Sequence, residues 1–166
     1  MALLKKTVFL DRDGIINRNR EDYVKKIEEF EILPDVPEAI RLLNLANYQV
    51  VIISNQSAVN RGLLTLDSLN QINKYLKNEL IKHSAHINGI YYCPHRPDEY
   101  CNCRKPNPTL IQKAVKELGI DLGNSIMIGD RKSDMETARR VGVRFVLMET
   151  NGELLKVVKL ILVNDD

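Results

Sequence analysis

Residues Val50 to Ile53 form an unbroken run of β-branched apolar side chains, and this run restricts the possible folds more than any other stretch. A strand that is apolar on both faces has to be covered on both faces, which is the usual situation in a parallel sheet. Further strand-like runs occur at 7–10, 87–92, 125–128 and 143–148. Helical patterns lie between these runs, so the sequence predicts an α/β fold with a doubly wound parallel sheet.

Two of the helical patterns begin with a recognisable start signal. Asp35 is followed three residues later by Glu38, and this pair predicts a capping box. Ser133 and Glu136 predict a second capping box, whose helix should end at Gly142.

The other intervals are less uniform. Apolar residues at helical spacing predict a helix over about 65–84, and another from 108 or 109 to 119. Segment 17–31 has no clear periodicity and predicts an irregular or hairpin insertion. Residues 154–163 are apolar enough to pack, but their pattern fits a helix and a strand equally well.

The composition is that of an ordinary globular protein. The 166 residues are 44% apolar and 28% charged, which is enough for one domain over residues 1–166 with a substantial core. A net charge of +2 predicts no strong attraction to nucleic acid or to a membrane surface. No apolar run approaches the ~20 residues of a membrane span, and too few residues precede Asp11 for a signal peptide. We therefore expect a cytoplasmic monomer.

Two carboxylates follow the first apolar run. Asp11 and Asp13 are two residues apart, and Gly14 allows the chain to turn sharply after them. An isolated Asp-x-Asp-Gly is most often only a turn. A calcium loop is excluded because such a loop needs an acid or amide and then a glycine where this chain has Ile15 and Ile16.

Further polar residues stand at the other expected strand ends. Ser54 ends the second strand, Asp130 ends the fourth, and Lys105 precedes the third helix. Because the carboxyl ends of parallel strands share one edge of a sheet, these residues can converge on Asp11 and Asp13. Mg²⁺ held by Asp11, Asp13 and Asp130 would offset the repulsion between a carboxylate and a phosphate dianion. Ser54 would hold phosphoryl oxygens, and Lys105 would supply a positive charge.

This order of motifs resembles the haloacid dehalogenase superfamily of phosphohydrolases, through Asp11-Arg12-Asp13-Gly14, Ser54, Lys105 and Gly129-Asp130 with Asp134. The resemblance implies that Asp11 is the nucleophile and that Asp13 protonates the leaving oxygen and then deprotonates water. It also implies that Asp11, the backbone carbonyl of Asp13, and Asp130 bind Mg²⁺. Asp134 would orient a neighbour such as Lys105.

A second group of residues predicts another metal. Cys93, His95, Cys101 and Cys103 place three thiolates and one imidazole within eleven residues. Four such ligands fit a tetrahedral, structural zinc site with no open position. A clustered, odd number of cysteines does not fit a disulfide framework. Arg104 and Lys105 follow the last ligand directly, so we expect zinc to orient them.

This zinc loop looks like that of the D-glycero-D-manno-heptose-1,7-bisphosphate phosphatases, through Tyr91–His95 and Cys103–Pro106. Ser54–Ser57 followed by Arg61-Gly62 looks like the same family, and the resemblance covers about residues 7–150. These enzymes lack a large cap domain, which the resemblance implies here as well. This chain has Ser54 where the family often has threonine, and Thr109-Leu110 where a glycine-methionine pair is common. Its C-terminus is also short.

By the same resemblance the substrate is a phosphorylated sugar, and the C7 phosphate of the heptose bisphosphate is removed during nucleotide-heptose synthesis for lipopolysaccharide core or S-layer. The expected substrate-binding residues are Asn19, Tyr23, Ser54, Asn55, Gln56, Ser57, Arg61, Arg104, Lys105 and Arg131. Arginine suits bidentate phosphate contacts, and Arg104 is the first choice for the second phosphate. Histidinol-phosphate phosphatases share the zinc loop and remain an alternative. A zinc-stabilised module that binds phosphate or nucleic acid without chemistry is a third possibility.

Overall fold

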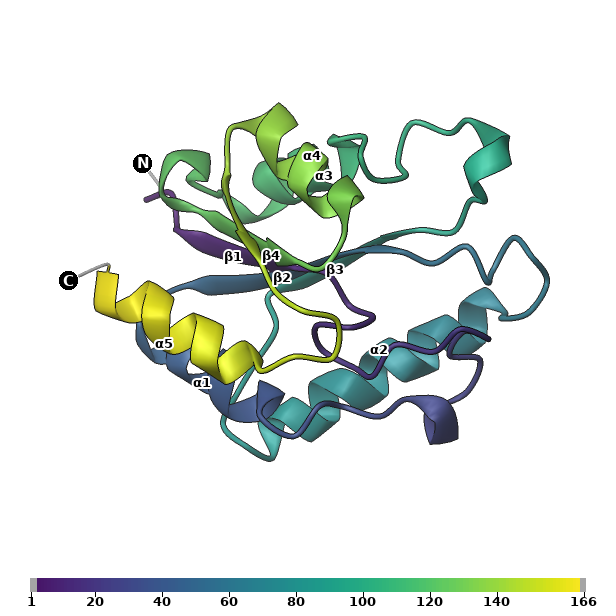
Figure 1. Ribbon diagram of the computed structural model, residues 1–166, viewed down its shortest axis with the longest axis horizontal. Coiled ribbons are helices and arrows are strands. Elements are labelled where there is room, and N and C mark those ends of the chain that lie inside the picture. Colours follow the sequence, from purple (N-terminus) through teal and green to yellow (C-terminus); the bar gives the residue numbers. More distant parts are fainter. Residues whose placement is uncertain (1–2, 165–166) are drawn as a thin grey trace.

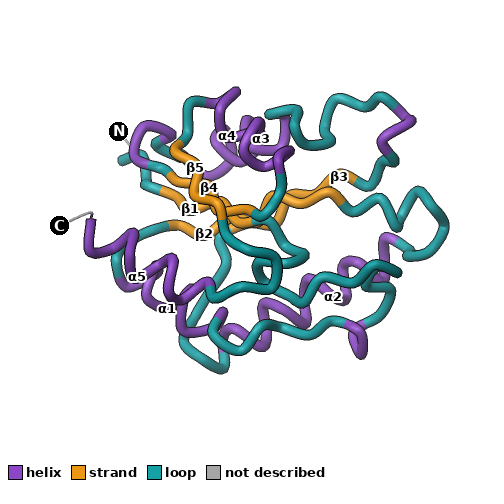
Figure 2. The backbone as a smooth tube through the Cα atoms, viewed as in Figure 1, coloured by secondary structure: helices purple, strands orange, loops and turns teal. Residues whose placement is uncertain are grey.

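The five apolar runs pair as parallel strands of one sheet. The structure, a computed structural model, describes residues 3–164. The strands are β1 (Thr7–Leu10), β2 (Gln49–Asn55), β3 (Gly89–Cys93), β4 (Ile126–Gly129) and β5 (Arg144–Leu147). Their order is β3-β2-β1-β4-β5, and every neighbouring pair is parallel (Figure 2). The predicted doubly wound parallel sheet is therefore confirmed.

Helices cover both faces of this sheet (Figure 1). One face carries α1 (Val36–Leu45), α2 (Leu66–Ile81) and α5 (Leu154–Asn164), and the other carries α3 (Thr109–Leu118) and α4 (Lys132–Val141). Among the described residues, no large cap domain is inserted between these elements.

The two faces explain the β-branched run in β2. Val50 and Ile52 pack in the core beneath α1, α2 and α5, whereas Val51 and Ile53 pack in the core beneath α3 and α4. All four side chains are fully buried. Successive residues of a strand point to opposite faces, so a strand buried on both faces has to be apolar throughout.

Both capping boxes differ from the prediction, although Asp35 does occupy the N-cap position of α1. The Asp35 carboxylate does not cap α1, because it accepts the backbone N–H of Leu155 at 2.7 Å and so fixes the start of α5. Helix α4 begins at Lys132, one residue before Ser133, and the Asp134 carboxylate accepts the backbone N–H of Arg131 at 3.1 Å. A distant partner thus takes the Asp35 carboxylate, whereas in α4 the role expected of Glu136 falls to Asp134. Glu136 instead accepts hydrogen bonds from Arg139 and Arg140.

The undecided and irregular segments are now defined. The tail forms α5, which packs beside α1. Segment 17–31 is largely irregular with one short 3₁₀ turn, Ile27–Glu29, and an isolated antiparallel bridge between Asn17 and Ile32 joins its ends. Helix α2 ends at Ile81, three residues earlier than expected, and its N-cap is Thr65, whose hydroxyl accepts the N–H of Ser68.

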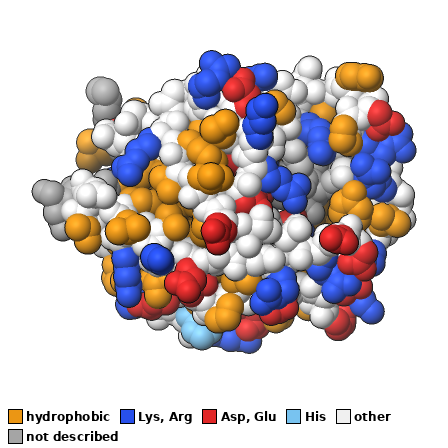
Figure 3. All heavy atoms as spheres, viewed as in Figure 1, with side chains coloured by type: hydrophobic (Ala, Val, Ile, Leu, Met, Phe, Trp, Pro, Cys, Tyr) orange, Lys and Arg blue, Asp and Glu red, His pale blue; other side chains and the backbone are white. Residues whose placement is uncertain are grey.

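One surface of the molecule mixes charge with apolar side chains. Basic and acidic side chains are interspersed on the face in Figure 3, and hydrophobic side chains gather over α5 and β5. Leu147, Leu160 and Val163 are among the exposed apolar residues of these two elements. Within residues 3–164, no helix has the length and apolar character to cross a membrane.

The packing of α2 supports a stability prediction. Leu76→Ala should destabilise the fold by about 2–5 kcal/mol, because Leu76 is fully buried in the core beneath the sheet. Leu66→Ala on the same helix should change stability by less than about 1 kcal/mol, because half of the Leu66 side chain is exposed. Chemical denaturation of both variants measures the difference, and equal losses would contradict this assignment of the core.

Candidate active site and metal centres

The Lys105 ammonium group lies at the centre of the converging strand ends. It donates hydrogen bonds to Asp11 Oδ1 at 2.9 Å, to Asp134 Oδ1 at 2.6 Å and to the carbonyl of Ile53 at 2.7 Å. Both Lys105 and Asp134 are buried. The structure thus brings together Lys105 and Asp11, which are 94 residues apart in sequence.

Charge complementarity stabilises this buried group. Burial acts to lower the pKa of Lys105, but the Asp11 and Asp134 carboxylates outweigh it and the pKa is raised. Burial also raises the pKa of Asp11, and the nearby Lys105 charge opposes that shift. Lys105 therefore stays charged, and it keeps the Asp11 carboxylate in a fixed orientation.

The Asp13 carboxylate is held by three side chains. Its Oδ1 accepts hydrogen bonds from Arg12 Nη2 and Asn17 Nδ2, each at 3.0 Å, and its Oδ2 accepts one from Gln56 Nε2 at 2.9 Å. Burial acts to raise the pKa of Asp13, but Arg12, Asn17 and Gln56 together lower it. Gln56 Nε2 also lies 2.6 Å from Ser54 Oγ, so this amide connects Asp13 to Ser54.

Asp11, Asp130 and Asp134 offer carboxylate oxygens within 4.8 Å of one another. Both oxygens of Asp134 already accept hydrogen bonds, from Lys105 and from the N–H of Arg131. Asp130 Oδ1, in contrast, is buried and has no hydrogen-bond partner among the described residues. Arg131 Nε lies 3.9 Å from this oxygen. A buried acceptor without a hydrogen bond, beside a second carboxylate, is the donor set that a hard divalent cation prefers. The predicted Mg²⁺ ligands Asp11 and Asp130 fit such a site, whereas the Asp13 side chain is outside the group.

Asn55 differs from the other predicted substrate-binding residues. Its Oδ1 accepts the backbone N–H of Lys105 at 2.9 Å, and its Nδ2 lies 3.3 Å from the Lys105 carbonyl. Asn55 therefore connects the end of β2 to the backbone of Lys105, and both polar atoms of its amide take part in that contact.

The four predicted zinc ligands lie in the loop between β3 and α3 (Figure 1). His95 Nδ1 lies 3.4 Å from Cys93 Sγ and 3.2 Å from Cys103 Sγ. The three cysteine sulfurs lie 2.8 to 3.8 Å from one another. A tetrahedron with Zn–S bonds of about 2.3 Å has edges of roughly 3.8 Å, so the cluster fits zinc. Burial acts to raise the pKa of Cys101, but backbone N–H groups of Arg104 and Cys103 lower it to about 7. Burial raises the pKa of Cys93 and of Cys103, so these two thiols depend on the charge of a bound metal to ionise.

A cavity of about 150 Å³ opens beside Asp13, and we call it the arginine pocket. Its arginines are Arg12, Arg20, Arg61, Arg104 and Arg131. The predicted substrate-binding residues Asn19, Tyr23, Asn55, Gln56 and Ser57 also line it. Lys105 and Ser54 are not part of its lining, and they lie among the buried groups around Asp11 and Asp13.

Several contacts fix the walls of the arginine pocket. Arg104 Nη1 donates to the carbonyl of His95 at 3.2 Å, which ties this arginine to the zinc loop. The Arg61 guanidinium lies over the Tyr23 ring, 5.8 Å from its centroid. Arg131 Nη2 lies 3.3 Å from Asn19 Oδ1.

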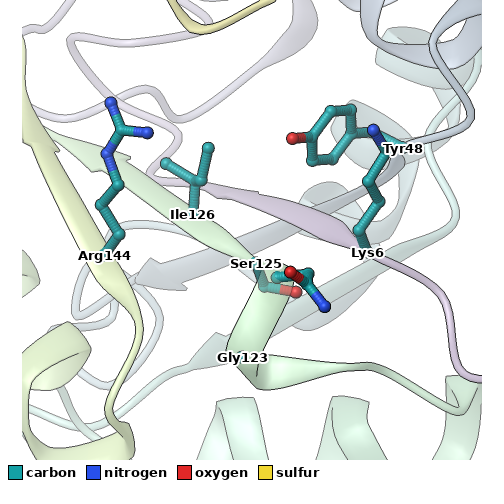
Figure 4. A pocket seen from close by; sticks show the side chains of 7 residues that line it. Lys6, Tyr48, Gly123, Ser125, Ile126 and Arg144 are labelled. Atoms are coloured by element: carbon teal, nitrogen blue, oxygen red, sulfur yellow. The ribbon is translucent and has the colours of Figure 1, made fainter. Parts of the chain in front are cut away.

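A second cavity, of about 300 Å³, is lined by residues at the opposite, amino ends of the strands (Figure 4). Lys6, Tyr48 and Ser125 immediately precede β1, β2 and β4, and Arg144 begins β5. None of the predicted site residues lines this cavity. The arginine pocket, although smaller, is therefore the candidate substrate site.

Sequence reasoning missed four residues of the site. Arg12 and Asn17 both contact Asp13, although only the Asp13 motif itself was singled out. The Thr150 hydroxyl donates to Asp130 Oδ2 at 2.6 Å, and Asn151 Oδ1 accepts the N–H of Asn19 at 2.7 Å. Thr150 and Asn151 follow β5, so their position after a predicted strand was the available signal.

Comparisons with known proteins agree with this geometry. Residues 102–156 match the HAD-hydrolase-like family model. The chain is 42% identical to a D-glycero-beta-D-manno-heptose-1,7-bisphosphate 7-phosphatase of Helicobacter pylori (strain J99), over 93% of this chain and 88% of that protein. It is 35% identical to the Pasteurella multocida protein of the same name, over 90% of this chain and 84% of that protein.

Solved structures give the same result. The crystal structure of D,D-heptose 1,7-bisphosphate phosphatase from B. bronchiseptica, complexed with magnesium and phosphate, superposes with a TM-score of 0.83. That match has 28% sequence identity and covers 96% of this chain and 99% of the other.

The contact between Gly14 and Asp130 supports a prediction about the Mg²⁺ site. A Cβ on Gly14 would lie 2.6 Å from Asp130 Oδ2, so Gly14→Ala should displace this carboxylate and weaken Mg²⁺ binding by about 10- to 100-fold. Gly142→Ala is the matched control, because Gly142 also has a positive φ but has no atom within 4 Å of the added Cβ. Both variants should lose about 1–2 kcal/mol of stability. Titration calorimetry with Mg²⁺ measures the difference, and equal affinities would contradict the placement of the metal.

Proposed function

Because the chain belongs to the haloacid dehalogenase-like hydrolases and, among them, to the family of D-glycero-D-manno-heptose-1,7-bisphosphate 7-phosphatases, we propose that it removes the C7 phosphate of D-glycero-D-manno-heptose 1,7-bisphosphate. It is a phosphoric monoester hydrolase, which excludes the alternative of a zinc-stabilised module that binds phosphate or nucleic acid without chemistry. Relatives are named for the β anomer, which makes that anomer the first substrate to test.

The arginine pocket beside Asp13 is the main reason to propose a bisphosphate substrate rather than a monophosphate. One phosphate has to reach Asp11, and the second needs its own cationic contacts. Two arginines of the pocket follow strands on either side of β1: Arg104 comes after β3, and Arg131 comes after β4. Arg104 is the first candidate for the second phosphate, since its contact with His95 orients it while it still lines the pocket.

Phosphoryl transfer would begin at Asp11. The carboxylate, oriented by Lys105, attacks phosphorus while the bond from phosphorus to the sugar oxygen breaks. Asp13, whose contacts lower its pKa, first has to take up a proton, and it then gives that proton to the sugar oxygen, which leaves as the hydroxyl. Asp13 then accepts a proton from water as the water attacks the aspartyl phosphate, and inorganic phosphate and free Asp11 result. Lys105 and Ser54 would hold the phosphoryl oxygens through both steps.

Mg²⁺ would be held by Asp11, by Asp130 and by the backbone carbonyl of Asp13. When bound, it supplies positive charge that neutralises the phosphoryl oxygens and the attacking carboxylate. Asp130 Oδ1, which is buried and accepts no hydrogen bond from the described residues, supports this assignment. Thr150 orients the other oxygen of Asp130, and Asp134 orients Lys105.

Zinc would have a structural role in the same enzyme. The tetrad of Cys93, His95, Cys101 and Cys103 would fix a polar loop that leads into Lys105 and carries Arg104. A site of three thiolates persists most readily in a reducing compartment. We therefore propose a cytoplasmic enzyme, with one phosphatase domain over residues 1–166, acting as a monomer in nucleotide-heptose synthesis.

Loss of zinc should lower activity through Arg104 and Lys105. Cys101→Ser should lose bound zinc and at least about 10-fold in kcat/KM, whereas Asn102→Ser, its exposed neighbour, should keep both. Metal content by mass spectrometry and phosphate release measure the two quantities on the same samples. A zinc-free Cys101→Ser protein with full activity would exclude a positioning role for the loop.

A comparison of substrates tests the proposed function. We expect kcat/KM for the β heptose bisphosphate to exceed that for histidinol phosphate by about 10- to 100-fold, because a second phosphate adds charged hydrogen bonds in the arginine pocket. The α anomer belongs in the same series. Faster turnover of histidinol phosphate would instead assign the enzyme to histidine biosynthesis.

A further inference from the structure

Arg12 is a buried arginine whose surroundings are unusual. Only 2% of the residue is exposed, and its guanidinium carbon lies 5.4 Å from the centroid of the Phe30 ring. The one hydrogen-bonded partner of the guanidinium among the described residues is Asp13, through Nη2 at 3.0 Å. Its Nε and Nη1 atoms are buried without a hydrogen-bond partner in that part of the chain.

This arrangement is a poor way to stabilise a fold. A buried guanidinium has five N–H donors and loses its hydration, and unpaired donors add to that cost. An apolar side chain of similar volume against Phe30 would avoid the cost altogether. Asp13 is the one side chain to which the Arg12 guanidinium donates a hydrogen bond. We therefore look for the role of Arg12 in its effect on the Asp13 carboxyl group.

The contacts of Asp13 show what Arg12 contributes. Asn17 and Arg12 approach the same oxygen, Oδ1, and Gln56 approaches Oδ2. Asn17 and Gln56 come from two separate loops, and Arg12 packs against the Phe30 ring. Arg12 is the one charged member of this set, and its guanidinium lies over the Phe30 ring while it contacts Asp13.

We propose that Arg12 is a positioning residue that holds the Asp13 carboxyl group in the orientation for proton transfer to the leaving oxygen. The inference rests on the proposed role of Asp13 as general acid, and it concerns the residue between the two aspartates rather than the aspartates themselves. A direct role of Arg12 in binding the phosphoryl group is the competing explanation, because Arg12 also lines the arginine pocket.

Two kinds of leaving group separate these explanations. An alkyl or sugar phosphate needs a proton on its leaving oxygen, whereas 2,4-dinitrophenyl phosphate releases a stable phenolate that needs none. Both substrates carry the same phosphoryl group. The constant to compare is kcat/KM, because it covers the steps up to phosphorylation of Asp11 and leaves out the later attack of water.

Arg12→Met should lower kcat/KM for the best sugar phosphate by about 10- to 100-fold, and for the dinitrophenyl ester by less than about 3-fold. Asp13→Asn should show the same selectivity with a larger loss. Arg41→Met, which removes an exposed arginine paired with Glu38 on α1, should alter neither constant. An equal loss on both substrates in Arg12→Met would overturn the proposal and support direct phosphate binding.

A double variant completes the test. If Arg12 acts through Asp13, adding Arg12→Met to Asp13→Asn should cost less than about a further 3-fold on the sugar phosphate. A full additional 10-fold loss would contradict the proposal.

The single variants separate the failure of this proposal from the failure of the proposed function. A loss confined to the sugar phosphate in Asp13→Asn but not in Arg12→Met would refute the role of Arg12 alone. Equal losses on both substrates in Asp13→Asn would refute the proposed role of Asp13. If Arg12→Met does not fold, Arg12→Lys, which keeps the charge, is measured in the same way with the same criteria.

Discussion

The buried ammonium group of Lys105 is the interaction on which the rest of the site depends. It joins the ends of β1 and β2 to the first turn of α4 through Asp11, the Ile53 carbonyl and Asp134. A buried cation needs such partners, since removal of one partner of a buried ion pair costs about 3–5 kcal/mol. The same contacts that stabilise Lys105 therefore fix the direction of the Asp11 carboxylate.

The zinc loop is connected to this centre by several contacts. The Gln56 N–H donates to the Cys93 carbonyl at 2.7 Å, and Arg104 donates to the His95 carbonyl. Asn55 holds the backbone of Lys105 itself. Through Gln56 the loop after β2 also contacts Asp13 and Ser54. The proposed zinc site, the nucleophile and the proton-transfer group are thus parts of one hydrogen-bonded network, although their motifs are far apart in the sequence.

Much of the fold followed from the sequence, because strands buried on both faces require residues such as Val50 to Ile53. The site residues at strand ends were also predictable, since parallel strands bring their carboxyl ends to one edge. Local spacing failed where a distant partner competed for a side chain, as when Asp35 binds the Leu155 N–H instead of capping its own helix. Arg12 and Thr150 were missed for a related reason. Arg12 stands inside the Asp11-Arg12-Asp13-Gly14 motif, but the motif does not indicate that its side chain binds Asp13. Thr150 belongs to no motif, and only its contact with Asp130 reveals its role.

The central claim is that Asp11 becomes phosphorylated during turnover. Borohydride reduces an acyl phosphate, so quenching the enzyme with borohydride while it hydrolyses a sugar phosphate converts a phosphorylated aspartate to homoserine. Peptide mass spectrometry then identifies the modified position. The account predicts homoserine at residue 11, dependent on substrate and absent from a sample quenched without it. Substrate-dependent homoserine at Asp13, Asp130 or Asp134 instead of Asp11 would contradict it.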